Sequence, residues 1–515
     1  MRPCAAAAAR LYLALLMNPS TQARAERLLS NFALLRAALL LLGVLGTWMW
    51  WTYWTNAFWI HQVIFLIITI SLTMVVWRPR WFLNLLLFVY LVDVTGQTTG
   101  TQIPGFIGIG GIAGNAKIGE LMTVAAVAQI AMYFCLRPSE FRRPLVGNVL
   151  LVVLTGAIAM ALGAKRYIAT NAFRDSLACY FVVFYIIAVV LLPSLRFALS
   201  TFRTIYYTAC IAVITMYILT IIERSTSAFY SSTYGMVYSS ITYLLLAKIA
   251  TSPKGARRWL SGLMIVLFVT GIFIGRARGP FFAFFIGLIP LLIALPWNIK
   301  FSFGVGAVAP ALVLMLALLT YRPTRIGSDL EDVGERRIES FTKIGNFEYD
   351  QTGSYRLTLW GMAWDGFMEN PLLGKGYGWL LPIRSGDILE NNMPASNVHN
   401  SYMHILACSG LLGFVPLLVL VIRFFRIVGH EMRTSTSRIK RIWAAAALGV
   451  GLNALVTPLT NVTLENLSAI LVWVLVALAL RLALASEKEL QTVIPYRMVW
   501  NAAPADKIAY EQRFR

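Results

Sequence analysis

Long apolar runs recur along most of the 515-residue chain, and they restrict the fold more than any other feature. A helix that crosses a bilayer needs about 17–25 mostly apolar residues, and many of the runs reach that length. Hydrophobic residues make up 58% of the chain, whereas charged residues make up only 13%. The sequence therefore predicts an all-α fold, a polytopic membrane helix bundle, rather than the two or more domains expected of a soluble chain this long.

The hydropathy pattern predicts about fourteen spans. The predicted spans lie near residues 37–54, 58–77, 81–94, 119–136, 145–163, 176–193, 205–222, 235–250, 259–274, 280–297, 301–319, 402–422, 442–458 and 466–482. The same pattern divides the chain into an N-terminal leader (1–30), a membrane helix bundle (31–319), a large loop with short helices (320–401), C-terminal membrane helices (402–482) and a tail (483–515).

Lysine and arginine gather on alternate connections between these spans. The densest group is the run from Arg423 to Arg441. By the positive-inside rule these connections and both chain termini are cytoplasmic, and the large loop faces outward. This placement accounts for much of the net charge of +21 by topology and contact with anionic headgroups, so we do not expect nucleic-acid binding.

Several basic residues fall on the outward connections, against the positive-inside rule. Arg276 and Arg278 lie between two predicted spans, flanked by Gly275 and Gly279, and Arg174 closes another outward connection. Snorkelling to headgroups would explain one such arginine, but two arginines among small residues favour a buried anion site, because guanidinium matches phosphate oxygens. Arg174 is followed by Asp175, and a purely structural pair and a functional role are equally compatible with that position.

The large loop contains a predicted helix that begins at Ser354 as N-cap and ends at Pro371. Trp360, Ala363, Trp364 and Phe367 are spaced as an apolar stripe, which predicts the face packed on the membrane domain. Arg356 lies one turn earlier on the same stripe. The following segment, Gly374-Lys-Gly-Tyr-Gly378, indicates a hinge or a close backbone approach.

No metal signature is present in the sequence, and we expect no cofactor. The five cysteines are scattered without paired spacing, so neither a disulfide framework nor a zinc site is indicated. His404 and Cys408 are one helical turn apart, which favours packing over ligation. His399 stands where the polar loop turns into an apolar helix, a position suited to proton transfer.

At His399 the chain resembles the O-antigen ligase and polymerase superfamily. The resemblance rests on His399-Asn400 followed by Gly410-Leu-Leu-Gly413, on Arg278-Gly279 at the start of an apolar helix, and on a loop pattern. That pattern comprises Arg356, Trp360, Ala363, Pro371, Gly374 and Gly376, and the clear resemblance covers roughly residues 260–420. The family has a Ser-Arg-Gly-like step at this position, and this chain has Ala277 in place of the serine.

The resemblance implies a GT-C-like glycosyltransferase of the bacterial inner membrane that works on the periplasmic face without a metal. Its donor would be a glycan on undecaprenyl diphosphate, and its acceptor lipid A–core for a ligase or another lipid-linked glycan for a polymerase. His399 would be the catalytic base of an inverting transfer, and Arg278, Arg276, Arg356 and Arg174 would bind the diphosphate. A ligase is our first prediction and a polymerase the alternative. A polysaccharide flippase would show internal repeats and charged or interrupted helices at mid-membrane, which we do not find in the sequence, and a scaffold would leave the outward arginines unexplained.

Overall fold

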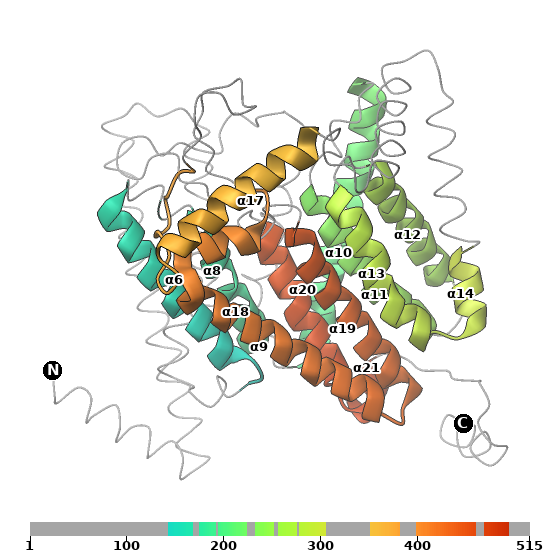
Figure 1. Cartoon of the computed structure of the whole chain (residues 1–515). Helices are drawn as coiled ribbons and strands as arrows, with labels where there is room; N and C mark the ends of the chain where they lie inside the picture. Colours follow the sequence, from blue (N-terminus) through green and yellow to red (C-terminus); the bar gives the residue numbers. More distant parts are fainter. Residues whose placement is uncertain are drawn as a thin grey trace, which may run out of the picture. The chain divides into compact units, whose positions relative to one another are not determined.

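A computed structural model describes residues 143–167, 172, 175–191, 194–223, 232–251, 256–274, 278–304, 351–381, 398–459 and 468–493, all within one compact unit. Every element in these residues is a helix, which confirms the all-α prediction. The helices are α6 (Val146–Arg166), α8 (Leu177–Phe181), α9 (Val183–Leu191), α10 (Leu195–Glu223), α11 (Ser232–Thr251), α12 (Ala256–Ile274), α13 (Arg278–Ala294), α14 (Trp297–Phe303), α17 (Gln351–Glu369), α18 (Ser401–Thr434), α19 (Arg438–Val456), η4 (Thr457–Leu459), α20 (Ser468–Ala483) and α21 (Glu487–Val493) (Figure 1).

Four stretches in the described residues are long and apolar enough to cross a membrane: Val146–Arg166, Leu195–Ile218, Ser401–Thr434 and Arg438–Leu459. Four shorter apolar stretches accompany them, Cys179–Val190, Trp259–Phe273, Gly279–Ala294 and Ala469–Ala483. The chain is therefore a membrane protein, as predicted. The leader, the four spans predicted before residue 137 and most of the span predicted at 301–319 lie outside the described residues, so the predicted number of spans stays a prediction.

Helix α19 lies at the centre of the bundle and packs against α11, α13, α18 and α20. Its run Ala444–Ala447 is completely buried, and Trp443 beside it is almost so. At Gly449 the backbone approaches α13 so closely that an added Cβ would lie 2.5 Å from the carbonyl oxygen of Gly287. Small residues at this contact allow the two helices to approach in a membrane setting, where close packing drives association.

Hydrogen bonds between helices supplement this packing. The side-chain amide of Asn453 on α19 donates to the carbonyl oxygen of Met236 at 2.6 Å and to Ser240 Oγ at 2.9 Å, both on α11. The hydroxyl of Tyr243 on α11 donates to the carbonyl oxygen of Phe284 on α13 at 2.7 Å. Because these buried polar groups are satisfied across helix boundaries, they fix α11, α13 and α19 in one register.

One end of the bundle carries the basic residues around the turn between α18 and α19. We call basic end the one with the start of α6, the end of α18, the start of α19 and the end of α20. There Lys440 pairs with Glu431 at 3.1 Å across the turn between α18 and α19, and Arg423 donates to Asn148 Oδ1 at 2.8 Å. The opposite end carries the start of α18, the end of α6 and the long diagonal helix α17 (Figure 1). His399, immediately before α18, therefore lies away from the basic end.

Two predictions about element boundaries were wrong. Most of the basic run 423–441 is helical, since α18 continues to Thr434 and α19 begins at Arg438. Lysine and arginine are good helix formers, so their abundance gives the side of the membrane without indicating a loop. Helix α17 begins at Gln351, so Ser354 lies inside it rather than at its cap.

Candidate functional site

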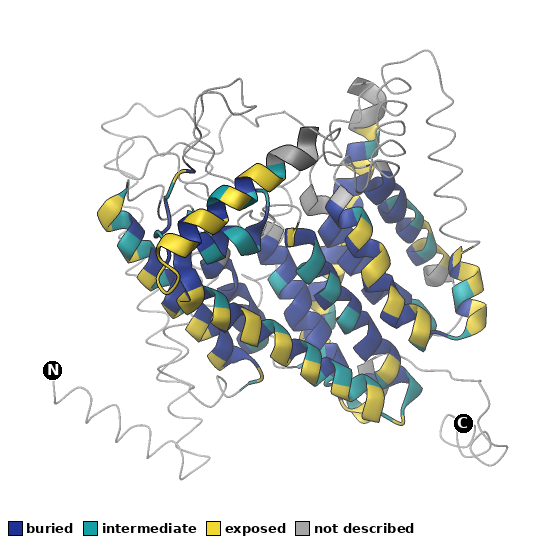
Figure 2. Ribbon diagram, in the orientation of Figure 1, coloured by how far each residue is buried: buried dark blue, intermediate teal, exposed yellow. Residues whose placement is uncertain are grey.

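Helix α17 lies across the end of the bundle opposite the basic end and buries one face (Figure 2). Leu359 and Ala363 are completely buried and form a small core with Leu381, Val398 and Ala407. Trp364, predicted to lie on the buried stripe, is 48% exposed instead. The stripe is rotated toward Leu359 because this side of the helix meets the residues that precede α18. Arg356 lies three residues before Leu359, is half-buried, and shares this inward side.

The described residues place Arg356 near enough to His399 for its charge to act on the imidazole. His399 is half-buried, and burial, followed by the positive charge of Arg356, holds the pKa of its imidazole below the ordinary value. The imidazole is therefore neutral at neutral pH and able to accept a proton. The α17 side of this pair is held in place by Trp360, whose indole Nε1 donates to the carbonyl oxygen of Val398 at 3.1 Å.

His399 adopts a left-handed backbone conformation, with φ of 51°. Such a conformation is uncommon outside glycine, and residues held in it concentrate at functional sites. Asn400 explains the turn on its far side, because its Oδ1 accepts hydrogen bonds from the backbone N–H of Tyr402 at 3.0 Å and of Met403 at 3.2 Å. Asn400 is thus the N-cap of α18.

Helix α18 is broken at Gly410, which has φ of 59° and ψ of −161°. This conformation is essentially restricted to glycine. The backbone groups released by the break pair with the segment that follows α17. Ala407 O accepts from Lys375 N and Cys408 O from Gly376 N, both at 2.9 Å, while Leu411 N donates to Pro371 O at 2.9 Å and Leu412 N to Leu372 O at 3.0 Å. All four groups are satisfied, as a membrane interior requires.

The segment Gly374–Gly378 is the predicted close backbone approach. Its three glycines all have positive φ, and a Cβ at Gly376 would lie 2.7 Å from the Cα of Gly163 on α6. Asp175 Oδ2 accepts from Gly378 N at 3.0 Å, and Arg166 Nη1 donates to Lys375 O at 3.2 Å. Asp175, whose role the sequence left open, therefore helps to hold this loop, as does Arg166.

A buried polar cluster lies beneath the loop. The hydroxyl of Tyr377 and the thiol of Cys179 are 2.9 Å apart, and both residues are buried. His404 and Cys408 are also buried, with 3.8 Å between His404 Nε2 and Cys408 Sγ, consistent with the packing role predicted for them. No group of three or more His, Cys, Asp or Glu side chains suited to a metal occurs in the described part of the chain.

The remaining predicted arginines are placed less fully. Arg278 is the first residue of α13, but its side chain is not among those described, and Arg276 and Arg174 lie outside the described residues. The end of α19 and η4 nevertheless connect α13 to the start of α18. The hydroxyl of Tyr402 donates to Leu455 O at 2.9 Å near the end of α19, and η4, which follows α19, contacts both α13 and α18.

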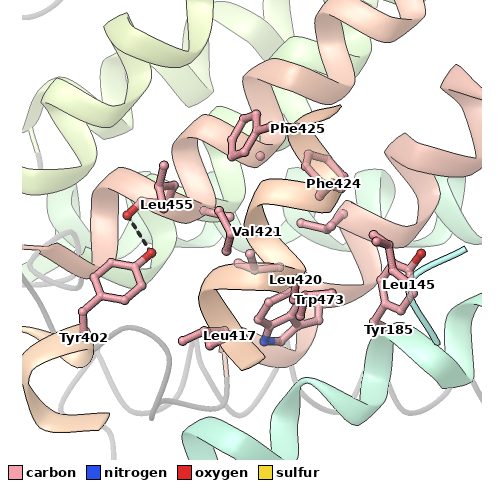
Figure 3. A pocket seen from close by; sticks show the side chains of 14 residues that line it. Leu145, Tyr185, Tyr402, Leu417, Leu420, Val421, Phe424, Phe425, Leu455 and Trp473 are labelled. Atoms are coloured by element: carbon pink, nitrogen blue, oxygen red, sulfur yellow. Dashed lines mark hydrogen bonds between the residues drawn. The ribbon is translucent and has the colours of Figure 1, made fainter. Parts of the chain in front are cut away.

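An apolar pocket of about 50 Å³ opens between α18, α19 and α20 (Figure 3). Tyr402, three residues after His399, lies on one side of it, and Tyr185 and Leu145 lie on the other. Trp473 on α20 also lines the pocket, and its buried Nε1 has no hydrogen-bond partner in the described residues. The sequence analysis did not identify this pocket, because its lining residues are ordinary apolar members of four separate helices.

Comparison with protein families agrees with this arrangement. A family model described as O-antigen ligase matches residues 263–418. This segment of the chain is similar to the O-antigen ligase superfamily. The matched segment runs from α12 to the first half of α18, and so includes Arg278, α17, the Gly374–Gly378 loop, His399 and the break at Gly410. A search of curated proteins gave no match.

The similarity of residues 263–418 to this family gives the site a general setting: a glycosyltransferase-like enzyme of O-antigen assembly that acts on lipid-linked glycans. Gly376 and Gly410, both within the matched segment, belong to one interlocked backbone arrangement. Asp175, Tyr377 and Trp360, which hold or fill that arrangement, were not singled out as site residues from the sequence. Only the pairing of distant segments reveals them.

Proposed function

We propose that the protein transfers a glycan from undecaprenyl diphosphate to a sugar hydroxyl of an acceptor, acting as an O-antigen ligase with lipid A–core as acceptor. One observation carries the proposal: a half-buried, left-handed His399 with a lowered pKa lies beside Arg356 within the O-antigen ligase segment. A neutral imidazole beside a fixed cation suits a reaction in which a hydroxyl loses a proton while a diphosphate departs.

In this mechanism His399 is the general base. The acceptor hydroxyl gives its proton to the imidazole while its oxygen attacks the anomeric carbon of the donor sugar. The bond between that carbon and the diphosphate oxygen breaks with inversion, and the diphosphate leaves with the bonding electron pair. General-base assistance of this kind contributes about 10²–10⁴-fold to a rate. Asn400 and Trp360 hold the base in position through the hydrogen bonds described above.

The arginines stabilise the leaving group in the same proposal. Arg356 is the described member of the set, and Arg278, Arg276 and Arg174 are the proposed further members. Guanidinium groups can bind diphosphate oxygens in pairs and stay charged in a poorly solvated place. They would then supply, without a metal, the electrostatic stabilisation that the developing negative charge requires. Lysine at Arg278 would reduce activity, because a point charge does not reproduce the two-pronged contact.

The apolar pocket between α18, α19 and α20 supports a lipid-linked donor. It is bounded by Tyr402, one helical turn from His399, and its walls are almost wholly apolar (Figure 3). We propose that part of the polyprenyl chain lies there while the diphosphate faces Arg356. In the same proposal the basic end of the bundle is cytoplasmic and His399 is periplasmic in a bacterial inner membrane, in keeping with the positive-inside rule.

The product that accumulates in a deletion strain tests this function. A ligase deletion leaves long polymer on the lipid carrier, unattached to lipid A–core, and the wild-type gene restores attachment. Single repeat units on the carrier would instead identify a polymerase, the alternative that the sequence suggests. Normal surface polysaccharide in the deletion strain would contradict both assignments. A depleted carrier-linked pool on the periplasmic face, with carrier-linked material retained on the cytoplasmic face, would indicate a flippase.

A further inference from the structure

A second cavity, which we call the basic cavity, lies at the basic end of the bundle, away from His399. Its volume is about 310 Å³, at the lower limit of the roughly 300–1,000 Å³ typical of ligand sites. It lies between the turn before α6, helix α9 and the end of α20. The residues lining it are Arg143, Pro144, Tyr185, Ala188, Val189, Ala477, Leu478, Leu480, Arg481 and Leu484.

Two arginines and no acidic residue line the basic cavity. Arg481 donates from Nη2 to Glu489 Oε1 at 2.7 Å, but its buried Nε has no hydrogen-bond partner in the described part of the chain. Arg143 forms no ion pair with any carboxylate of the described residues. A buried guanidinium donor without an acceptor is costly unless a ligand supplies one. The cavity is therefore suited to an anion, and phosphate oxygens match the guanidinium geometry.

The turn that carries Arg143 is held in an unusual conformation. Leu145 has φ of 65°, which is rare for a bulky residue. The hydroxyl of Tyr185 on α9 donates to the carbonyl oxygen of Pro144 at 2.9 Å and so fixes this turn against α9. Backbone strain of this kind persists only where the surroundings enforce it, and it recurs at ligand clamps. This strain is a second observation, independent of charge, that marks the site.

The rest of the lining is apolar and belongs to membrane helices. Alanine, valine and leucine side chains of α9 and α20 form the walls. A free inorganic anion gains no free energy from contact with apolar side chains, whereas a lipid gains free energy by burying its acyl chains against them. We propose that the basic cavity binds the phosphate of an anionic phospholipid between Arg143 and Arg481, with an acyl chain along Val189 and Leu480. Basic pockets between membrane helices on the cytoplasmic side are suited to such headgroups.

This lipid site is separate from the proposed catalytic site and does not depend on it. The two are joined physically through Tyr185, which lines both the basic cavity and the apolar pocket near Tyr402. A bound lipid would hold α9 and α20 together at the basic end, and thereby stabilise one wall of the apolar pocket. The expected consequence is thermal stabilisation by anionic lipid, whatever reaction the protein catalyses.

The test measures the melting temperature of the full-length protein in detergent while one additive is titrated. The additives are phosphatidylglycerol, phosphatidylcholine and inorganic phosphate. We expect phosphatidylglycerol to raise the melting temperature at concentrations at which the other two have little effect. In the Arg143→Gln/Arg481→Gln double variant its apparent affinity should fall at least about tenfold, since charge-assisted hydrogen bonds are lost. Native mass spectrometry should show the same loss of retained lipid.

Two controls separate the cavity from general surface charge. Glu489→Gln removes the ion pair of Arg481 without removing either cavity arginine, and should retain the lipid. Arg196→Gln changes an exposed arginine of α10 that does not line the cavity, and should also retain it. If the double variant is unstable, Arg143→Gln alone decides, because it leaves the Arg481–Glu489 pair intact. Equal stabilisation by phosphatidylcholine or by inorganic phosphate, or undiminished lipid affinity in the arginine variants, would overturn the proposal.

Discussion

The indole Nε1 of Trp360 donates a hydrogen bond to the carbonyl oxygen of Val398 at 3.1 Å, and so joins helix α17 to the residue immediately before His399. We expect Trp360→Phe to keep the ring packing but to release His399 from its position. Small misplacements of a catalytic group cost up to about 10²-fold in rate, so transfer should fall about 10- to 100-fold. The matched control is Trp364→Phe, because Trp364 is exposed on the same helix; equal rates for both variants would exclude the positioning role.

Gly410 has a backbone conformation that other residues do not tolerate, and a Cβ there would lie 2.5 Å from the carbonyl oxygen of Leu372. Gly410→Ala should therefore cost about 2–5 kcal/mol, from backbone strain and overpacking together. Gly429→Ala on the same helix is the control, because nothing lies within 4 Å of its added Cβ. Melting of the purified proteins measures the difference. A Gly410→Ala protein as stable as the control would mean that the helix break is not required.

Asn400 is interpreted as a helix cap rather than as a participant in chemistry. Asn400→Ala should destabilise the protein by about 0.5–2 kcal/mol, whereas Asn400→Ser should restore most of that stability, because serine caps helices well. The glycan-transfer rate of the serine variant should approach that of wild type. A serine variant with normal stability but no transfer would assign Asn400 a chemical role instead.

Comparison of the helices with the sequence pattern shows which features the sequence predicts well. The hydropathy of residues 235–250 and 259–274 predicted helices that are present as α11 and α12. Apolar length alone suffices there, because a chain in lipid must satisfy its backbone within each segment. The rotation of α17 was not predictable in the same way. Leu359 rather than Trp364 is buried, because its partners Leu381 and Val398 come from elsewhere in the chain.

The break in α18 could not be predicted from the sequence, for a related reason. Gly410 occurs in an apolar run, where a glycine also serves simply to let helices pack closely. Its partners, Pro371 and Leu372, precede it by almost forty residues. Local patterns do not record such pairings. Of the candidate site, the sequence singled out His399 and Arg356 by their residue types and positions, whereas the support supplied by Asp175 required the folded backbone.

The pH dependence of transfer should report on His399. His399 must be neutral to act as a base, so the rate falls as pH falls through its pKa. The acidic limb of the pH–rate profile should therefore have its midpoint below the ordinary histidine pKa of about 6.5. Arg356 disfavours the imidazolium, so Arg356→Met should raise this pKa and move the limb of kcat/KM to higher pH, whatever it does to the maximal rate. Lys165→Met, an exposed change at the same end, should leave the limb in place. A limb that stays or moves to lower pH in the Arg356 variant would contradict the assignment.

The glycan-transfer rate of a His399→Asn variant tests the central claim most directly. Asparagine tolerates the left-handed backbone of His399 better than alanine does, so the variant removes the base with little change in backbone strain. His430→Asn is the matched control, because His430 is exposed and lies near the end of α18. The account predicts that His399→Asn loses about 10²–10⁴-fold of the transfer rate while remaining stably inserted, and that His430→Asn keeps the wild-type rate. A stable His399→Asn protein that transfers glycan at the wild-type rate would contradict the account.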